Sequence, residues 1–471
     1  MADTKFLLFG TGDYYERYKK WFQREDVLAL LDNSPAKQNE MIDGIKVLSP
    51  DEGVRLSFDV IVILSFYVKA MRKQLVDLGV PENKIYHFYD LHGLLYKKEL
   101  KRPVQYYGNA EKVVELSGQS EKKVLLLSQD LTLGGPSIAL FHVAKILVKR
   151  GYQVVYASMI DGPLREKLLA NNIPVIVDVN LQIETMKDSE WIRNFSLLFC
   201  NTINYHVFLS ERDISIPVIW WLHDSEFFYD GVNRETLVNL DKGNLRVCSV
   251  GPVPRNAMHK MIADMPVDDL LYGVEDMVGN VRQTQDRYTD KICFVTIGYI
   301  EERKGQDLLV QAIQRLPDEY RTKAVFYLVG QDSSMMAQQI KAEIKNMPEI
   351  IMTGTVDRDG IKKILNDADV MICPSREDPM PTVATEAMMY SVPCILSDAA
   401  GTADYVRDGI DGFIFPSESV EELSVRIQWC IDHNQELSEM GIRARQIYEK
   451  FCSMKVFEEN LLDIVNEVEA D

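Results

Sequence analysis

The sequence predicts an α/β protein whose strands form parallel sheets. Two observations carry this prediction: short apolar runs alternate with amphipathic helical patterns along most of the 471 residues, and several runs end in loops rich in glycine or proline. The alternation falls into three successive regions, and a hydrophobic content of 46% is enough to give each region a core. We therefore expect three α/β units in one chain.

The first region, residues 1–95, is predicted to be a small parallel sheet with strands at residues 5–9, 27–31, 59–64 and 84–88. Gly10 and Gly12 follow the first strand, but Tyr15 stands where a dinucleotide-binding fingerprint has its third glycine. Asp32 ends the second strand. Because Tyr15 is too bulky for close packing of helix on strand, we interpret this region as a Rossmann-like accessory domain for docking or oligomer contacts.

Residues 96–122 are polar and poor in large aliphatic side chains, and we interpret them as a linker with room for a short helix. The second region, residues 123–280, opens with a strand, a loop containing Gly134 and Gly135, and an amphipathic helix. The third region, residues 281–450, continues the alternation, and a last helical pattern occupies residues 451–471.

The strongest functional signal lies in the third region. A strand predicted at residues 369–373 ends in a loop rich in proline and aspartate, and Thr382 then opens a helix. Backbone N–H groups at such a helix N-terminus bind anionic phosphates. Asp378 and Glu386 frame the loop, so their carboxylates can accept hydrogen bonds from hydroxyls of the same ligand. The pattern indicates a nucleotide-sugar site.

The spacing Asp378-x7-Glu386 resembles the Glu-x7-Glu motif of retaining GT-B glycosyltransferases, specifically family four. Three further segments resemble the phosphate-clamp strand and helix and the nucleotide-lining strand ends of that family, at residues 294–313, 327–330 and 351–356. The resemblance covers residues 123–471. It implies a GT-B fold, with an acceptor domain in the second region, a donor domain in the third, and a last helix that crosses back to the acceptor domain.

The resemblance also implies roles for charged residues. Lys304, with adjacent Arg303, is expected to neutralise the donor diphosphate, while Asp378 binds the sugar and Glu386 the ribose. Many family members carry arginine after the glycine of this strand, whereas this chain has Tyr299 there. His223 is expected beside the reacting sugar. The expected donor-binding residues are Gly134, Gly135, Gly298, Gly330, Gly354, Thr355, Val356, Met380, Pro381, Thr382, Val383 and Glu386.

The implied activity is retaining transfer from a nucleotide-sugar, with a UDP-sugar favoured, to a glycan, lipid-linked or protein-linked acceptor in bacterial surface polysaccharide or glycoconjugate synthesis. The nucleotide-sugar is a substrate, and we predict no cofactor. We expect no Asp-x-Asp metal motif on a strand-end loop and no metal. The alternative is a catalytically weak GT-B subunit that supports a partner glycosyltransferase, because Tyr299 leaves the usual arginine–lysine pair incomplete.

Composition limits the partners and the location. A net charge of −19 argues against nucleic acid, whose binding needs clustered cations. The absence of a long apolar run or a signal-peptide pattern predicts a cytoplasmic protein that contacts at most the inner face of the membrane. Self-association is expected through the N-terminal region. Because every expected donor residue follows the linker, the sequence also predicts that the donor cleft survives removal of residues 1–95.

Overall fold

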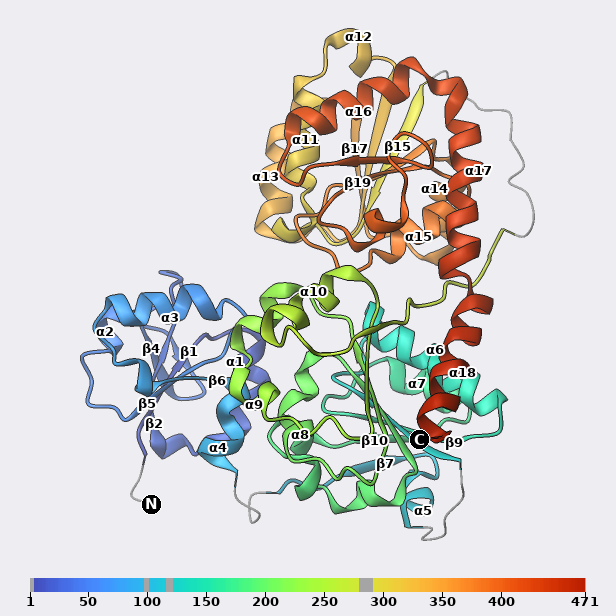
Figure 1. Ribbon diagram of the computed structural model, residues 1–471. Helices are drawn as coiled ribbons and strands as arrows, with labels where there is room; N and C mark the ends of the chain where they lie inside the picture. The colour runs from blue at the N-terminus through green and yellow to red at the C-terminus, as the bar shows by residue number, and fades with distance from the viewer. Residues whose placement is uncertain (1–3, 97–100, 116–121, 279–290, 471) are drawn as a thin grey trace.

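The computed structural model describes residues 4–96, 101–115, 122–278 and 291–470. Three sheets of six, eight and six strands follow one another along the chain. Helices flank each sheet, and the N-terminal domain lies beside the second unit, with the third unit above the second (Figure 1). We call the second and third units the acceptor domain and the donor domain, after the roles that the sequence resemblance implies. The predicted α/β fold class is confirmed.

The N-terminal sheet has the strand order β3-β4-β2-β1-β5-β6. Its strands are β1 (Phe6–Phe9), β2 (Val27–Leu31), β3 (Met41–Ile42), β4 (Ile45–Leu48), β5 (Val60–Ile63) and β6 (Ile85–His87), and its helices are α1 (Asp13–Tyr18), α2 (Pro50–Gly53), α3 (Val68–Asp77) and α4 (Leu91–Leu95). Only β3 pairs antiparallel. β3 and β4 were not among the predicted strands; β3 is only two residues long.

The acceptor domain contains the eight-stranded sheet, in the order β14-β13-β12-β11-β8-β9-β10-β7. Its strands are β7 (Gln105–Tyr107), β8 (Lys123–Ser128), β9 (Gln153–Ser158), β10 (Val175–Val177), β11 (Leu197–Asn201), β12 (Val218–Leu222), β13 (Leu245–Ser249) and β14 (Asp268–Asp269). Its helices are α5 (Ala110–Glu115), α6 (Gly135–Lys149), α7 (Leu164–Ala170), α8 (His206–Ser210), α9 (Arg234–Val238) and α10 (Pro252–Met261).

The predicted linker at residues 96–122 is in part wrong. β7 lies within it and pairs antiparallel with β10, so it forms an edge strand of the acceptor sheet. The helix expected there is α5, whose Ala110, Val113 and Val114 are buried. Polar residues dominate the segment because an edge strand and a surface helix each bury one side only. Residues 97–100 and 116–121 of the predicted linker, and the predicted boundary at residues 280–281, lie outside the described residues.

The donor domain contains six parallel strands in the order β17-β16-β15-β18-β19-β20. They are β15 (Ile292–Ile297), β16 (Ala324–Val329), β17 (Ile350–Gly354), β18 (Val370–Cys373), β19 (Cys394–Ser397) and β20 (Phe413–Phe415). The helices are α11 (Gln306–Arg315), α12 (Asp318–Arg321), α13 (Met335–Glu343), α14 (Arg358–Asp367), α15 (Thr382–Met389), α16 (Val420–Asp432) and α17 (Leu437–Ile447).

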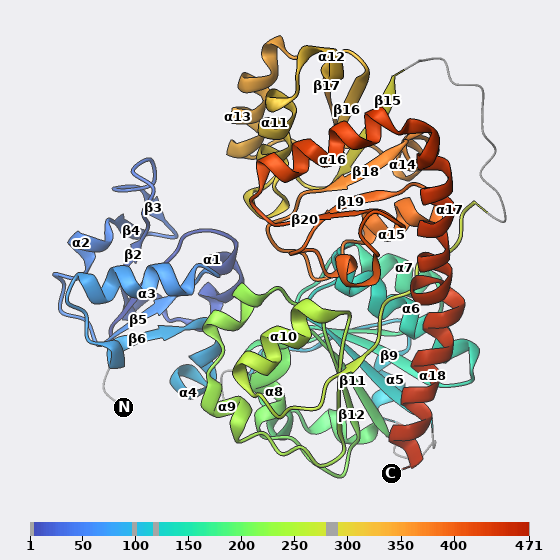
Figure 2. The ribbon, with the colours of Figure 1, turned by 45° about the horizontal axis from the view of Figure 1, so that its top comes forward.

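The last helix, α18 (Met454–Ala470), leaves the donor domain and runs along the acceptor domain (Figure 2). Phe457 stacks on Trp221 of β12 with ring centroids 5.7 Å apart, and Arg150 pairs with Glu458 at 2.6 Å. A second connection is made by Tyr272, whose hydroxyl donates to the backbone oxygen of Met380 at 2.9 Å. These contacts hold the two halves of the cleft to one another. Within the described residues, no helix is long and apolar enough to cross a bilayer.

The N-terminal domain shares a core with the acceptor domain. Trp21, Phe88 and Tyr89 belong to the same buried cluster as side chains of the acceptor sheet. The Trp21 indole N–H donates to Gln182 at 3.0 Å, and the Tyr89 hydroxyl donates to Asn204 at 2.5 Å. Removal of residues 1–95 would therefore expose large aromatic side chains. The shared core argues against the prediction that the donor cleft survives this removal.

Candidate active site

The loop between β18 and α15 has the form that the sequence predicts. Thr382 is the first residue of α15, and the extended Pro381 precedes it as the N-cap, with the preset backbone angle that suits this position. Met380 is buried, and Val383 is partly buried against the main core. Asp378 and Glu386 are both buried, with 5% and 7% of their surfaces exposed. One buried carboxylate therefore lies in the loop before α15, and the other lies one turn inside the helix.

A second loop meets the first from the neighbouring strand β15. Gly298 directly follows this strand, and Lys304 ends a 3₁₀ turn (Glu302–Lys304) rather than opening the helix, since α11 begins at Gln306. The Lys304 Nζ lies 2.5 Å from Oδ2 of Asp378. Gly305, the next residue after Lys304, has a φ of 67°. A β-carbon on Gly305 would lie 2.1 Å from the backbone oxygen of Pro374 in the loop after β18. Only glycine allows this close approach of the two loops.

Arg303, the residue before Lys304, makes a hydrogen bond and an ion pair with other residues. Its Nη1 donates to the backbone oxygen of Glu377 at 3.0 Å, and its Nη2 lies 2.8 Å from Glu301. Tyr299, at the position where the family carries arginine, is 42% exposed. Lys304 and Arg303 thus place two cations in this loop, and Lys304 is the one in contact with Asp378.

The ends of β16 and β17 lie next to the end of β15 in the donor sheet and form a third part of the candidate site. A β-carbon on Gly330 would lie 1.9 Å from the backbone oxygen of Gly298, so this glycine lets the two strand ends meet. Gly354 ends β17 and is followed by Thr355 and Val356. These residues thus lie at the carboxyl edge of the donor sheet, beside the loops that carry Lys304 and Glu386.

Arg358, which sequence analysis did not select, reaches Glu386. Its Nη1 lies 2.7 Å from Oε1 of Glu386, from the first residue of α14. Burial raises the pKa of Glu386 above its usual range, and Arg358 acts in the opposite direction. The pairing joins residues 28 positions apart in the sequence numbering, so only the folded chain brings them together.

An Asp-x-Asp spacing does follow a strand, contrary to the expectation from sequence. Asp357 and Asp359 flank Arg358 after β17. Asp357 caps α14 by accepting from the backbone N–H of Gly360 at 2.8 Å, while Asp359 pairs with Lys362 at 3.0 Å. The two carboxylates therefore have different protein partners.

The acceptor side contributes residues at the carboxyl ends of β8 and β12. Gly134 is the N-cap of α6 and Gly135 its first residue. His223 directly follows β12 and is 8% exposed, and burial lowers the pKa of its imidazole to about 3. Its buried Nε2 has no hydrogen-bond partner among the described residues. A neutral histidine with an unsatisfied ring nitrogen is suited to bind a hydroxyl group.

Asp224, the residue after His223, holds the loop after β12 in place through its side chain. One of its carboxylate oxygens accepts from the backbone N–H of Ile203 at 2.6 Å. Burial raises the pKa of Asp224 to about 7. The side chain fixes the strand-end loops after β11 and β12 to each other, so its contacts are structural.

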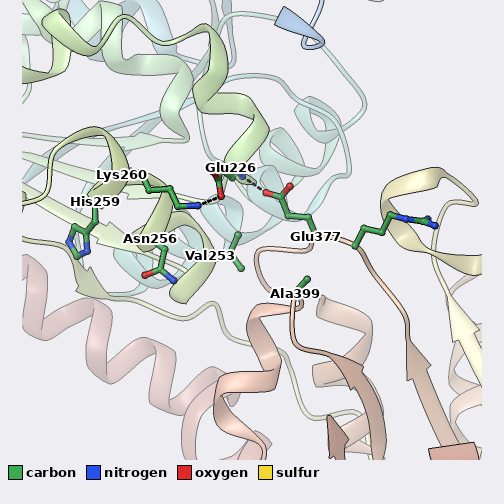
Figure 3. A pocket seen from close by; sticks show the side chains of 8 residues that line it. Glu226, Val253, Asn256, His259, Lys260, Glu377 and Ala399 are labelled. Carbon is green, nitrogen blue, oxygen red and sulfur yellow. Dashed lines mark hydrogen bonds and ion pairs between the residues drawn. The ribbon is translucent and has the colours of Figure 1, made fainter. Parts of the chain in front are cut away.

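A pocket of about 620 Å³ lies between the two halves (Figure 3). Acceptor-domain side chains line one wall and donor-domain side chains the other; the lining residues are Glu226, Val253, Asn256, His259, Lys260, Arg376, Glu377 and Ala399. Glu377 directly precedes Asp378, so this pocket adjoins the predicted sugar site. Sequence analysis selected none of its residues, because its walls come from segments more than a hundred residues apart.

The structure brings some predicted residues together and leaves others apart. Lys304 contacts Asp378, Gly330 closely approaches Gly298, and Glu386 lies on the helix that Thr382 opens. Gly134, Gly135 and His223 lie across the cleft, at the carboxyl edge of the acceptor sheet.

Two family models match the GT-B part of the chain. Residues 120–243 match the model described as Glycosyl-transferase family 4, and residues 279–447 match Glycosyl transferases group 1. These two parts of the chain are thus similar to group 1 and family 4 glycosyltransferases. Residues 2–86 match a different model, described as C2185-like, N-terminal.

Related proteins resemble only parts of the chain. An uncharacterised glycosyltransferase of Methanocaldococcus jannaschii is 24% identical over 180 residues, which are 36% of this chain and 44% of that protein. Granule-bound starch synthase 1 of Pisum sativum is 33% identical over 118 residues, which are 25% of this chain and 19% of that protein. The chain thus spans less than half the length of these relatives.

Solved structures share the fold. HepE of Anabaena, in a complex with UDP and glucose, has a TM-score of 0.61 at 17% identity, covering 74% of this chain and 100% of that one. Sucrose-phosphate synthase of Thermosynechococcus elongatus has a TM-score of 0.58 at 16% identity, covering 74% and 99%. The likeness identifies the arrangement of two α/β domains as GT-B.

Proposed function

We propose that the protein is a retaining glycosyltransferase that uses a nucleotide-sugar, with a UDP-sugar favoured, as donor. The contact between Lys304 and Asp378 carries the proposal, because it joins a cation for phosphate to a carboxylate for sugar hydroxyls at one strand edge. HepE has been solved with UDP and with UDP-glucose, which supports UDP as the first nucleotide to test.

The donor would bind across the ends of β15 to β18. Backbone N–H groups at the start of α15 and the ammonium of Lys304 would hold the diphosphate, Glu386 would accept from the ribose hydroxyls, and Asp378 would orient the sugar. In retaining transfer at the front face of the sugar, a diphosphate oxygen takes the proton of the acceptor hydroxyl as the glycosidic bond to the leaving phosphate breaks. The protein then needs cations for the leaving group rather than a catalytic base.

The acceptor is proposed to bind in the pocket lined by Glu226 and Glu377. Its lining is rich in carboxylate, amide and cationic side chains, with Val253 and Ala399 as apolar members. Such a lining suits a hydroxyl-rich glycan rather than a lipid tail. We propose a role in bacterial polysaccharide or glycoconjugate synthesis in the cytoplasm, at most peripheral to the membrane, with self-association through the N-terminal domain. The partner-dependent, catalytically weak subunit is less favoured, since Lys304, Asp378 and Glu386 are all in place.

The direct test is binding and turnover of UDP compounds. We expect UDP to raise the thermal unfolding midpoint more than GDP or ADP at equal concentration, and UDP-glucose to be hydrolysed slowly without an acceptor. Calorimetric titration with UDP and detection of released UDP check the two steps separately. Failure of all nucleoside diphosphates to bind would contradict the proposal.

The Glu386–Arg358 pair gives a prediction with a pH dependence. Glu386→Ala should weaken UDP binding by about 1–3 kcal/mol, because the ribose hydroxyls lose a buried carboxylate acceptor. In the parent, the raised pKa of Glu386 means that UDP affinity falls on acidification at a higher pH than an ordinary carboxyl group would cause. Arg358→Ala removes the cation that lowers this pKa, so the fall should move to still higher pH.

Calorimetry with UDP across a pH series measures both effects. Arg315, exposed at the end of α11, serves as the control, and Arg315→Ala should follow the parent curve. An unchanged pH profile in Arg358→Ala would show that Arg358 does not act on Glu386.

A further prediction is that transfer needs no divalent cation. The positive charge for the diphosphate is supplied by Lys304 and the helix termini, while Asp357 and Asp359 are engaged with the α14 cap and with Lys362. UDP release should be the same in EDTA and in added manganese. Activity that is abolished by EDTA and restored by manganese would refute this prediction.

A further inference from the structure

A short 3₁₀ segment connects the N-terminal domain to the donor domain. This segment, η10 (Glu226–Gly231), begins two residues after His223–Asp224 in the acceptor domain. Its first residue contacts the donor domain, while Phe227, Phe228, Asp230 and Gly231 lie against the N-terminal domain. Two domains thus contact one segment of the acceptor wall from opposite ends.

Aromatic packing makes the contact with the N-terminal domain. Phe66, in the loop after β5, lies edge-on to Phe228 with ring centroids 4.3 Å apart, and 6.0 Å from Phe227. Phe66 is itself packed against Tyr14 of α1 at 4.3 Å. At the end of η10, a β-carbon on Gly231 would lie 2.5 Å from the His87 ring, so the backbone of η10 lies directly against the last residue of β6.

An ion pair adds to this contact but carries less of it. Lys69 of α3 lies 2.5 Å from Asp230, with the lysine side chain 74% exposed. Exposed pairs of this kind contribute little to stability. Of these two contacts with the N-terminal domain, the aromatic contact of Phe66 is therefore expected to contribute more.

The other end of η10 reaches the donor domain. The backbone N–H of Glu226 donates to Oε1 of Glu377, and the Glu226 carboxylate lies 2.5 Å from Nζ of Lys260 (Figure 3). Glu377 is the residue before Asp378, which contacts Lys304. The hydrogen bond thus joins the acceptor wall to the loop that is predicted to hold the sugar.

We propose that the N-terminal domain is a positioning element of the active site, with Phe66 holding η10 so that the Glu226 amide engages Glu377 and fixes the two walls of the acceptor pocket. The role rests on the proposed function, because the pocket matters for transfer only if a sugar is transferred there. Phe66 is a positioning residue and touches no substrate. Through Phe66, the N-terminal domain, which contains no predicted donor residue, would help to set the position of Glu377 next to Asp378.

The kinetic test compares Phe66→Ala with Tyr67→Ala, its 77% exposed neighbour. With UDP-glucose hydrolysis as the assay, Phe66→Ala should lower kcat by about tenfold and leave KM and UDP affinity within about twofold, since the donor is bound elsewhere. Phe66→Leu should recover part of the loss, and Tyr67→Ala should match the parent. Glu377→Ala should cause a similar loss, and the double variant should be no worse than about twofold below either single variant.

If the kcat losses of Phe66→Ala and Glu377→Ala multiply in the double variant, the proposal is overturned. A fall in the UDP affinity of Phe66→Ala equal to its fall in kcat would also overturn the proposal. Hydrogen exchange at the amides of residues 226–231 gives a second test that does not depend on turnover. Phe66→Ala should speed exchange at Glu226 by about tenfold while the protein stays folded, and Tyr67→Ala should not. Unchanged exchange in Phe66→Ala would overturn the positioning role even if UDP-glucose is turned over, and faster exchange would support it even if no hydrolysis occurs.

Discussion

Lys304→Ala is expected to lower sugar transfer by about a hundredfold or more, because it removes the cation that stabilises the leaving diphosphate in a partly dehydrated cleft. The ammonium group lies 2.5 Å from Asp378 and is carried on a loop that Gly305 holds tightly against the neighbouring strand end. The variant should keep its fold, since Lys304 retains 22% side-chain exposure and packs in no apolar cluster. Steady-state UDP release at saturating UDP-glucose measures the effect.

Lys455→Ala is the matched control, because this lysine is 84% exposed on α18 and lies outside the cleft. It should have parent activity. Lys304→Arg should recover part of the lost rate, since it restores the positive charge with different geometry. Unchanged turnover in Lys304→Ala at saturating donor would remove Lys304 from the catalytic mechanism.

Deletion of the N-terminal domain is expected to destabilise the whole protein. A chain that begins at Lys101 keeps β7 and α5 but loses Trp21, Phe88 and Tyr89 from the shared core. Burial of each large side chain contributes about 1.5–3 kcal/mol, so the loss should lower the thermal unfolding midpoint by about 10 °C or more, or cause aggregation. Thermal unfolding and size-exclusion chromatography measure this outcome.

Arg55→Ala within the full chain is a suitable comparison, because Arg55 lies in the N-terminal domain, is 72% exposed and pairs with Asp51 of α2. It should unfold like the parent. A soluble monomer from the deletion, with the parent's midpoint and UDP affinity, would show that the N-terminal domain is an independent appendage.

The donor half of the site was largely predictable from the sequence, for a local reason. The β18 strand, the loop with Asp378, and the helix from Thr382 through Glu386 follow one another within about 20 residues, so strand period, proline and helix start show in the sequence itself. Gly305 and Gly330 could be predicted as loop glycines, but the close approaches that require them depend on neighbouring strands.

The contacts between distant segments could not be predicted in this way. Arg358 resembles an ordinary exposed residue at a helix start until folding places it beside Glu386. β7 is three residues long and polar, so its membership of the acceptor sheet depends on β10 being next to it. Phe66 follows a strand like many buried phenylalanines, and its contact with Phe228 joins two units that sequence analysis treated as separate.

The central claim, retaining transfer from a UDP-sugar, is tested most directly by following UDP-glucose turnover by NMR at the anomeric proton. Retaining transfer predicts release of UDP with the α-anomer of glucose formed first, at a rate that Lys304→Ala lowers by about a hundredfold. Initial formation of the β-anomer would contradict retention. UDP binding without any turnover of UDP-glucose or of other UDP-sugars, with or without glycan acceptors, would contradict the assignment as an active transferase.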